Sequence, residues 1–181
     1  ASFGATAGLA AFWRGCGYRP VRLGMRRDPA SGAHSLVVLR PLDAAAAAAA
    51  AELRTAFADQ LPWLLGDGLQ DVETDLVAEL VAGMAPLPPG PRDRQALARY
   101  TAGAADYAQA LAALRRATWN LLAAGRAGQL AARDLDLLVG RLLQQRGWAA
   151  LAAEYDLAGR RGVERELRGV VARVAAGLAD G

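Results

Sequence analysis

The sequence predicts an α+β protein that is mostly α-helical, in which a short N-terminal β-α-β-β segment is followed by a helical bundle. In the first 42 residues, short apolar runs alternate with turn signals, as they do in strands and short helices. From residue 43 onward, apolar residues recur three and four positions apart and no strand pattern competes. The chain has 181 residues, 54% of them hydrophobic and 22% charged, so it can bury a core. We therefore expect two regions, residues 1–42 and residues 43–181.

The first region is predicted to place one helix before a β-hairpin. Ala7 to Gly15 carries apolar residues on one helical face, and the glycines at 15 and 17 end the helix. Val21 to Met25 alternates apolar residues with glycine and arginine, as a half-buried strand does. The turn formers at 28–32, Asp-Pro-Ala-Ser-Gly, and the apolar run within His34 to Leu39 complete the hairpin.

The second region is predicted to be helical apart from a proline-rich loop. Asp43 is a good N-cap for a helix that begins with eight consecutive alanines and runs to about Phe57. Residues 85–91 contain four prolines and cannot be helical, because proline lacks the amide donor and clashes with the preceding turn. Further helices are predicted at Val72 to Ala82, Asp93 to Ala124 with a break near Gly103, Leu135 to Gln145, Trp148 to Tyr155, and Arg161 to Ala179.

Charge and cysteine usage narrow the class of protein. All 21 basic residues are arginine, a bias that is typical of a GC-rich genome and is weak support for RNA binding by itself. Residues 1–43 nevertheless contain six arginines and two aspartates, and this local excess can attract phosphate groups. Cys16 is the only cysteine, so the chain has no disulfide framework. No apolar run reaches the roughly 20 residues that a membrane span needs. We therefore expect a cytoplasmic protein. Because the chain starts at Ala1 without a signal peptide, we expect a piece of a longer protein.

The sequence contains few residues of the types that act in catalysis. His34 is the only histidine, and without ligand partners it is interpreted as a surface or strand-edge residue rather than a catalytic one. Asp134 with Asp136 and Glu164 with Glu166 lie two positions apart, where helical side chains diverge, so neither pair is expected to share a proton. No serine lies in a nucleophile elbow, and there is no lysine for a P-loop. We predict no catalytic residue and no metal site in this chain.

Two groups of arginines are the candidates for RNA contact. Arg161, Arg165 and Arg168 recur at helical spacing next to Arg160, and such a basic stripe suits contacts to phosphate. Ion pairs within the helix, such as Glu164 with Arg168, are an equally good interpretation. The predicted RNA-binding residues are Arg22, Arg26, Arg27, Arg160, Arg161, Arg165 and Arg168.

The N-terminal region also resembles a known family. The residues that carry the resemblance, in order and spacing, are Ser2-Phe3-Gly4, Thr6, Leu9, Phe12-Trp13, Cys16-Gly17-Tyr18, Val21-Arg22, Gly24, Arg27, Ser31-Gly32, Leu39 and Pro41. They are similar to those of the tRNA(Met) cytidine acetyltransferases, and beyond residue 42 the resemblance is one of position and helical character. It implies that residues 1–42 are the last strands and helix of a GNAT acetyltransferase domain, and that residues 43–181 are a helical tRNA-binding domain at the C-terminal end.

The resemblance implies an enzyme that transfers an acetyl group from acetyl-CoA to N4 of the wobble cytidine of elongator tRNA(Met), with the use of ATP. The family's acetyl-CoA pyrophosphate loop and ATP motifs lie upstream of this segment, so the chain alone is expected to be inactive and to bind neither cofactor tightly. Gly8 and Gly15 occupy positions where family members carry an acidic and a basic contact to acetyl-CoA. Arg14, beside the second of them, is the candidate substitute for cofactor binding.

The leading hypothesis is therefore a segment that completes the acetyltransferase fold and positions tRNA. The alternative is a non-catalytic helical interaction or self-association module, with RNA bound elsewhere. A stand-alone small-molecule acetyltransferase is disfavoured because the pyrophosphate loop is missing. Expected partners are elongator tRNA(Met) and the upstream GNAT and helicase-like domains of the same protein, with no membrane. A hairpin without its neighbouring strands also leaves an open strand edge, through which the chain can form a homodimer.

Overall fold

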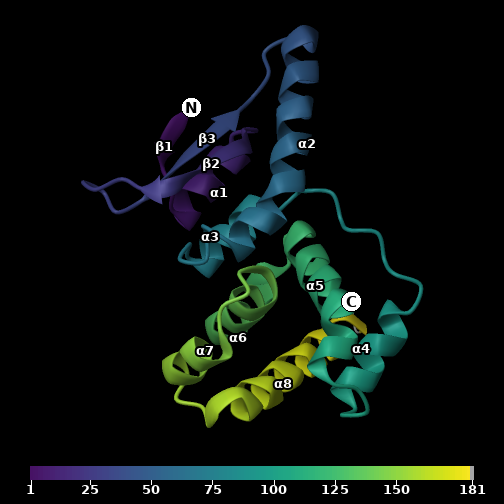
Figure 1. Cartoon of the computed structure of the whole chain (residues 1–181). Helices are drawn as coiled ribbons and strands as arrows, with labels where there is room; N and C mark the ends of the chain where they lie inside the picture. Colours follow the sequence, from purple (N-terminus) through teal and green to yellow (C-terminus); the bar gives the residue numbers. More distant parts are fainter. Residues whose placement is uncertain (180–181) are drawn as a thin grey trace.

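The computed structural model describes residues 1–179 and confirms the α+β class with a helical majority (Figure 1). Its N-terminal part contains β1 (Ser2–Gly4), α1 (Ala7–Gly15), β2 (Arg19–Arg27) and β3 (His34–Leu39). The α-helices that follow are α2 (Ala44–Gly66), α3 (Thr74–Val81), α4 (Asp93–Thr101), α5 (Tyr107–Ala123), α6 (Ala132–Leu138), α7 (Trp148–Glu154) and α8 (Gly159–Ala179). A 3₁₀ turn, η1 (Ala127–Gln129), precedes α6, and a π-helix, η2 (Val139–Leu143), follows it.

The three strands form an antiparallel sheet in the order β1-β3-β2, so β3 is central. Leu36 of β3 lies opposite Phe3 on one side and Leu23 on the other. The predicted hairpin turn is confirmed, because the Asp28 carboxylate accepts hydrogen bonds from two amides of the turn and Gly32 adopts a φ of +67°, which favours glycine. Within the described residues β1 and β2 each pair with one strand only, so each has an open edge.

Helix α2 extends further than the sequence predicts. An end near Phe57 was expected, but the helix continues to Gly66 through Pro62. Leu61 and Leu65 lie on the same face as Phe57 and are buried with it. Burial of each such side chain contributes about 1.5–3 kcal/mol, which together outweighs the roughly 3 kcal/mol cost of a proline inside a helix.

The N-terminal half of α2 stands apart from the body of the chain. Asp43 caps the helix as predicted, and its carboxylate accepts the amide of Ala46 at 2.7 Å. Residues 44–49 are exposed, and Ala50 is the first buried residue of the helix. In Figure 1 this half of α2 projects beyond the sheet. The alanine run is therefore a helix, as its propensity predicts, although its first six residues are exposed to solvent.

The predicted breaks between the later helices are confirmed. The proline-rich segment at 85–91 contains no helix, and it separates α3 from α4. The break near Gly103 divides the predicted 32-residue stretch into α4 and α5, and Gly103 itself has a φ of +76°. Asp106 then starts α5 with a capping box, in which its side chain and that of Gln109 each accept a backbone amide.

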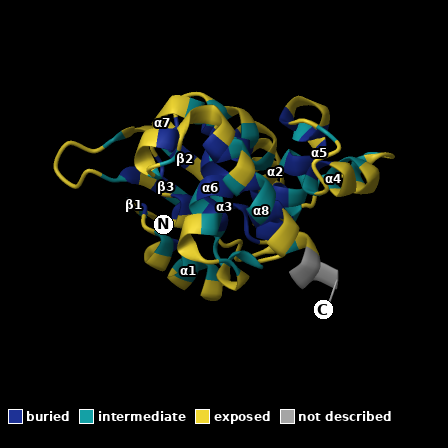
Figure 2. Cartoon of the chain, turned by 90° about the horizontal axis from the view of Figure 1, so that it is seen from below, coloured by how far each residue is buried: buried dark blue, intermediate teal, exposed yellow. Residues whose placement is uncertain are grey.

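The sheet shares its hydrophobic core with the helices. Leu23, Leu36 and Val38 pack in one buried cluster with residues of α2, α3, α5 and α6. A second cluster joins α4, α5, α6, η2, α7 and α8. Since α5 and α6 contribute to both clusters, they hold the sheet side and the α7–α8 side of the chain together. Figure 2 shows buried residues gathered around α3, α6 and α8. The secondary structure changes at residue 42, but the core continues across it.

Candidate functional site

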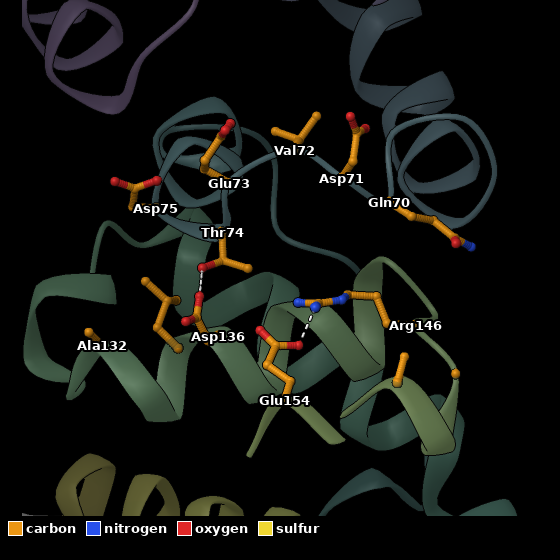
Figure 3. A pocket seen from close by; sticks show the side chains of 13 residues that line it. Gln70, Asp71, Val72, Glu73, Thr74, Asp75, Ala132, Asp136, Arg146 and Glu154 are labelled. Atoms are coloured by element: carbon orange, nitrogen blue, oxygen red, sulfur yellow. Dashed lines mark hydrogen bonds and ion pairs between the residues drawn. The ribbon is translucent and has the colours of Figure 1, made fainter. Parts of the chain in front are cut away.

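An open hollow of about 720 Å³ lies between the α2–α3 connection and the helices α6 and α7 (Figure 3). Its charged lining residues are Asp71, Glu73, Asp75, Asp136, Glu154 and Arg146. The Thr74 hydroxyl donates a hydrogen bond to Asp136, and Arg146 donates to Glu154. With five carboxylates and one arginine, the walls repel phosphate, so this hollow is not an RNA backbone site.

The described residues form neither a metal-binding cluster nor a membrane-spanning helix. Among residues 1–179, no group of three histidine, cysteine, aspartate or glutamate side chains is placed to hold a metal ion. No helix within these residues combines the length and the apolar character needed to cross a bilayer.

The arginines of β2 divide into two kinds. Arg22 and Arg26 are exposed and have no hydrogen-bond or ion-pair partner among residues 1–179. Arg27 instead binds the α2–α3 connection: its Nε donates to the Asp71 carboxylate at 2.7 Å, and its Nη atoms donate to Glu73 at 3.2 Å. Hydrogen bonding by Arg27 holds the pKa of Asp71 below its usual range, against a smaller opposing effect of burial. Arg27 therefore links the hairpin to the helices.

The four predicted arginines of α8 also differ from one another. Arg160 pairs with Glu164 at 2.8 Å, and the guanidinium of Arg168 lies 5.0 Å from the ring centre of Tyr100. The interpretation of these arginines as partners in ion pairs within the helix is therefore confirmed for Arg160. The example of Glu164 with Arg168 is wrong, because Glu164 pairs with the preceding turn of the helix instead. Of these four arginines, only Arg161 and Arg165 are exposed and have no hydrogen-bond or ion-pair partner in the described part of the chain.

The fold brings each arginine group together but keeps the two groups apart. In Figure 1 β2 lies in the upper part of the chain and α8 in the lower part, with α3 and α6 between them. The main contacts of the sheet with a later helix are those between β2 and α2, whereas the main contacts of α8 are with α4, α6 and α7. The two arginine groups are thus separate surfaces.

Arg14, the predicted cofactor-binding residue, points toward α3. Its Nε and Nη2 donate to the Glu79 carboxylate at 3.1 and 2.8 Å. The neighbouring Gly8 and Gly15 face open space and offer no side chain. Taken together, these residues do not fit a site for the acetyl-CoA pyrophosphate, because the one cation present is already neutralised by a carboxylate.

His34 is not the surface or strand-edge residue that the sequence suggested. It begins the central strand β3, and its side chain is 2% exposed. Nδ1 lies 2.8 Å from the Gly24 carbonyl oxygen, and Nε2 lies 3.6 Å from Oδ1 of Asp71. Sequence reasoning failed here because burial of His34 depends on residues 71–73, which approach the hairpin only in the folded chain.

Other polar contacts between helices were also missed. Arg116 of α5 holds Asp93 of α4 through two hydrogen bonds of 2.7 and 2.5 Å, and the pKa of Asp93 is lowered mainly by this bonding. The guanidinium of Arg141 lies 4.2 Å from the ring centre of Trp148 and 5.2 Å from that of Tyr107. No spacing rule predicts such pairs, since their partners lie on different helices.

Gln144 follows the π-helix and connects it to the α2–α3 connection. The residue is fully buried, and its Nε2 donates to the carbonyl of Val72 at 2.6 Å and to that of Leu69 at 3.4 Å. Its Oε1 has no hydrogen-bond partner among the described residues. Buried amide groups that bond loop carbonyls fix one arrangement of neighbouring elements. The sequence did contain one signal for this contact, a polar residue at the end of a predicted apolar helix.

The sequence of the chain is similar to proteins of one family. No protein-family model matches the chain. It is 35% identical over 171 residues to tRNA(Met) cytidine acetyltransferase TmcA of Nitrosococcus halophilus. This alignment covers 92% of this chain and 23% of that protein. The proteins of the same name from Vibrio cholerae and Haloarcula marismortui are 31% and 32% identical over 92% and 96% of this chain.

The similarity is nearly complete for this chain and partial for its relatives. The chain spans less than a quarter of the length of these three relatives. Because the matched stretch includes most of the helical part, the similarity reaches beyond the 42 residues from which the resemblance was predicted. The resemblance is therefore confirmed, and over nearly its whole length this chain is homologous to one segment of the tRNA(Met) cytidine acetyltransferases.

Proposed function

We propose that this chain completes the acetyltransferase domain of a tRNA(Met) cytidine acetyltransferase and holds its tRNA substrate. The observation that carries the proposal is the similarity of more than nine-tenths of the chain to relatives of that name. The reaction proposed for the whole protein is transfer of an acetyl group from acetyl-CoA to N4 of the wobble cytidine of elongator tRNA(Met), with the use of ATP.

The proposed role of this segment is positioning rather than chemistry. Its only histidine is buried against a carbonyl and a carboxylate, and Arg14 is paired with Glu79. A cytidine amine must be presented to a thioester with the base held out of its stack. Arginines that bind the RNA backbone can hold the tRNA in place while groups upstream of this segment act on the base.

Exposed apolar residues on α1 support an upstream partner in the same protein. Phe12 is 60% exposed and Leu9 is 43% exposed. They lie on the helix that follows β1, and β1 has an open edge. We propose that the upstream GNAT domain covers this surface. In its absence the same edge is the proposed route to a homodimer of the chain.

Two pairs of arginines are the proposed RNA contacts. Arg161 and Arg165 are four residues apart on α8, a rise of about 6 Å along one helical face, so both reach the same stretch of RNA backbone. Arg22 and Arg26 form the second pair, on β2. All four side chains are exposed, whereas the ion-paired Arg27 and Arg160 need to leave a carboxylate to bind phosphate.

A gel shift of the chain with elongator tRNA(Met) over a range of salt concentrations tests the proposal. We expect binding that weakens as salt rises. The double variant Arg161→Gln/Arg165→Gln is expected to bind more weakly, with a salt slope lower by about two, roughly one for each lost phosphate contact. Arg173→Gln is the matched control, since Arg173 lies on the same helix but is paired with Asp134.

The outcomes separate the proposal from its alternative. Unchanged binding by the double variant removes Arg161 and Arg165 from the proposed RNA surface. An equal loss in Arg173→Gln shows that the loss is not specific to the two arginines without an ion-pair partner. Absence of tRNA binding by the wild-type chain at low salt favours the alternative, a helical interaction or self-association module with RNA bound elsewhere.

A further inference from the structure

An arginine of the π-helix packs against two aromatic rings where α5, η2, α7 and α8 meet. The guanidinium of Arg141 lies 4.2 Å from the ring centre of Trp148 on α7 and 5.2 Å from that of Tyr107 on α5. From α8, the guanidinium of Arg160 approaches the same Trp148 ring to 5.2 Å. Side chains from three helices therefore converge on the guanidinium of Arg141.

Two more arginines lie close to these rings. The guanidinium of Arg168 on α8 lies 5.0 Å from the ring centre of Tyr100. Burial raises the pKa of Tyr107, and the charges of Arg141 and Arg115 oppose this rise, so both cations lie near the Tyr107 hydroxyl. Burial likewise raises the pKa of Tyr100 to about 12 against the opposing charge of Arg168. The three arginines thus gather around the same two tyrosines.

The guanidinium groups of Arg141 and Arg168 keep donors that the chain does not use. Nη1 of Arg141 donates to the Arg146 carbonyl at 2.5 Å, but neither Arg141 nor Arg168 is paired with a carboxylate among residues 1–179. Their Nε atoms are buried, and both residues are half-buried, so part of each guanidinium reaches the surface. An aromatic ring contacts the flat face of a guanidinium and leaves the N–H groups at its edge available. A cation that is partly removed from water and lacks a counter-charge attracts an anion strongly.

One carboxylate lies among these cations, and it already has a partner. Glu164 pairs with Arg160 at 2.8 Å, and its charge acts on the hydroxyls of both Tyr100 and Tyr107. The charges of Glu164 and Arg160 cancel. The cations that remain, which we call the arginine cluster, are Arg115, Arg141 and Arg168.

We propose that the arginine cluster is a phosphate-binding site whose ligand is a backbone phosphate of RNA. Arg168 lies three residues after Arg165, so the cluster adjoins one of the exposed pairs proposed to contact RNA. The edge of a guanidinium can donate two parallel hydrogen bonds to a phosphate and so fix its position. Because the aromatic rings already hold Arg141 and Arg168, binding immobilises few additional side-chain rotamers. The inference rests on the proposed binding of tRNA and adds the residues that hold a phosphate in a defined place.

A gel shift with elongator tRNA(Met) over a range of salt concentrations tests the site. Arg141→Gln/Arg168→Gln is expected to bind more weakly than the wild type, with a salt slope lower by about two. Arg173→Gln is the control, because Arg173 lies on α8 but is paired with Asp134. An unchanged slope in the double variant, or an equal change in the control, overturns the site. The proposed function stands in that case, since the wild-type chain still binds tRNA.

Inorganic pyrophosphate gives a second readout that needs no tRNA. A phosphate bound to Arg141 should shift the guanidinium against the Trp148 indole and change its fluorescence. At constant ionic strength we expect a saturable change, which is absent from Trp148→Phe and from Arg141→Gln/Arg168→Gln. This titration decides the matter if the wild-type chain does not bind tRNA. No saturable change, or a change that persists in the double variant, then overturns the site, whereas a change that the double variant lacks supports it although the proposed tRNA binding fails.

A third variant covers the case in which the double variant does not fold, as judged by circular dichroism. Arg115→Gln then replaces it in both experiments, because Arg115 makes no hydrogen bond or ring contact in the described part of the chain that the substitution would break. We expect a salt slope lower by about one and weaker binding of pyrophosphate. Binding of tRNA and of pyrophosphate equal to that of the wild type contradicts the proposal.

Discussion

The two kinds of arginine on β2 give the sharpest prediction about what holds the hairpin in place. Arg27→Ala removes hydrogen bonds to the Asp71 carboxylate at 2.7 Å, to the carbonyls of Asp71 and Gly32 at 2.5 and 2.8 Å, and to Glu73 at 3.2 Å. Both carboxylates are more than half exposed, so each ion pair counts for about 0.2–1 kcal/mol. With about 0.5–1.5 kcal/mol for each carbonyl bond, we expect a loss of about 3 kcal/mol in the free energy of unfolding.

Urea unfolding followed by circular dichroism measures this loss. Arg22→Ala is the matched control, because Arg22 lies on the same strand but is exposed without a partner among the described residues. A surface substitution of that kind is expected to change stability by no more than about 0.5 kcal/mol. Equal effects of the two substitutions would refute the assignment of Arg27 to a structural role, and would return it to the set of free arginines that we expect to contact RNA.

The same variant has a defined pH dependence. The pKa of Asp71 is lowered in the fold, mainly by its hydrogen bond from Arg27. Its contribution to stability is therefore fully present above the unfolded-state pKa of about 3.9, and it is lost as pH falls through the folded-state value. The stability difference between wild type and Arg27→Ala should shrink below about pH 4. A difference that stays constant to pH 2 would show that the charge of Asp71 does not matter.

Two further predictions concern buried polar groups. Gln144→Met removes the donor to the Val72 carbonyl, and we expect the free energy of unfolding in urea to fall by about 1–2 kcal/mol. The loss is limited because Oε1 of Gln144 lacks a hydrogen-bond partner in the described chain, so its removal leaves no further bond broken. An equally stable variant would show that the bond to Val72 makes no net contribution to stability. Burial raises the pKa of Tyr100 and of Tyr155 to about 12. Since unfolded tyrosine ionises near pH 10, stability should fall as pH rises from 10 to 12, with late absorbance changes at 295 nm that are reduced in Tyr100→Phe.

Local sequence signals predicted the elements of the fold well where the cause is itself local. The hairpin turn at 28–32, the cap at Asp43 and the break near Gly103 each depend on residues within four positions, and the structure has all three. The end of α2 was wrong because it depends on distant packing. Leu61 and Leu65 enter a core made with α3, α5 and the sheet, and this burial carries the helix past Pro62.

Side-chain roles were predicted less well than elements, for the same physical reason. Arg26 and Arg27 are neighbours with the same charge, yet one is exposed and the other is bound by carboxylates that lie more than 40 residues away. Helical spacing likewise allowed Glu164 to pair toward either end of α8, and only the fold selects Arg160. Sequence spacing tells which residues share a face, but it does not tell which of them already have a partner.

The separation of the two free arginine pairs leads to a last prediction about RNA binding. Arg22 and Arg26 lie on β2, and Arg161 and Arg165 lie on α8. In Figure 1 α3 and α6 lie between these elements, and the acidic hollow lies between the α2–α3 connection and the helices α6 and α7. An RNA backbone that crosses the hollow meets carboxylates, so the two pairs should act as independent contacts. Substitutions at distant sites without shared partners are additive within about 0.3–0.5 kcal/mol. We therefore expect the effects of the two double Arg→Gln variants on the logarithm of Kd for tRNA to add in the quadruple variant. A quadruple variant no weaker than one of the doubles would mean that both pairs grip one continuous stretch of RNA, and that the acidic hollow does not divide the surface.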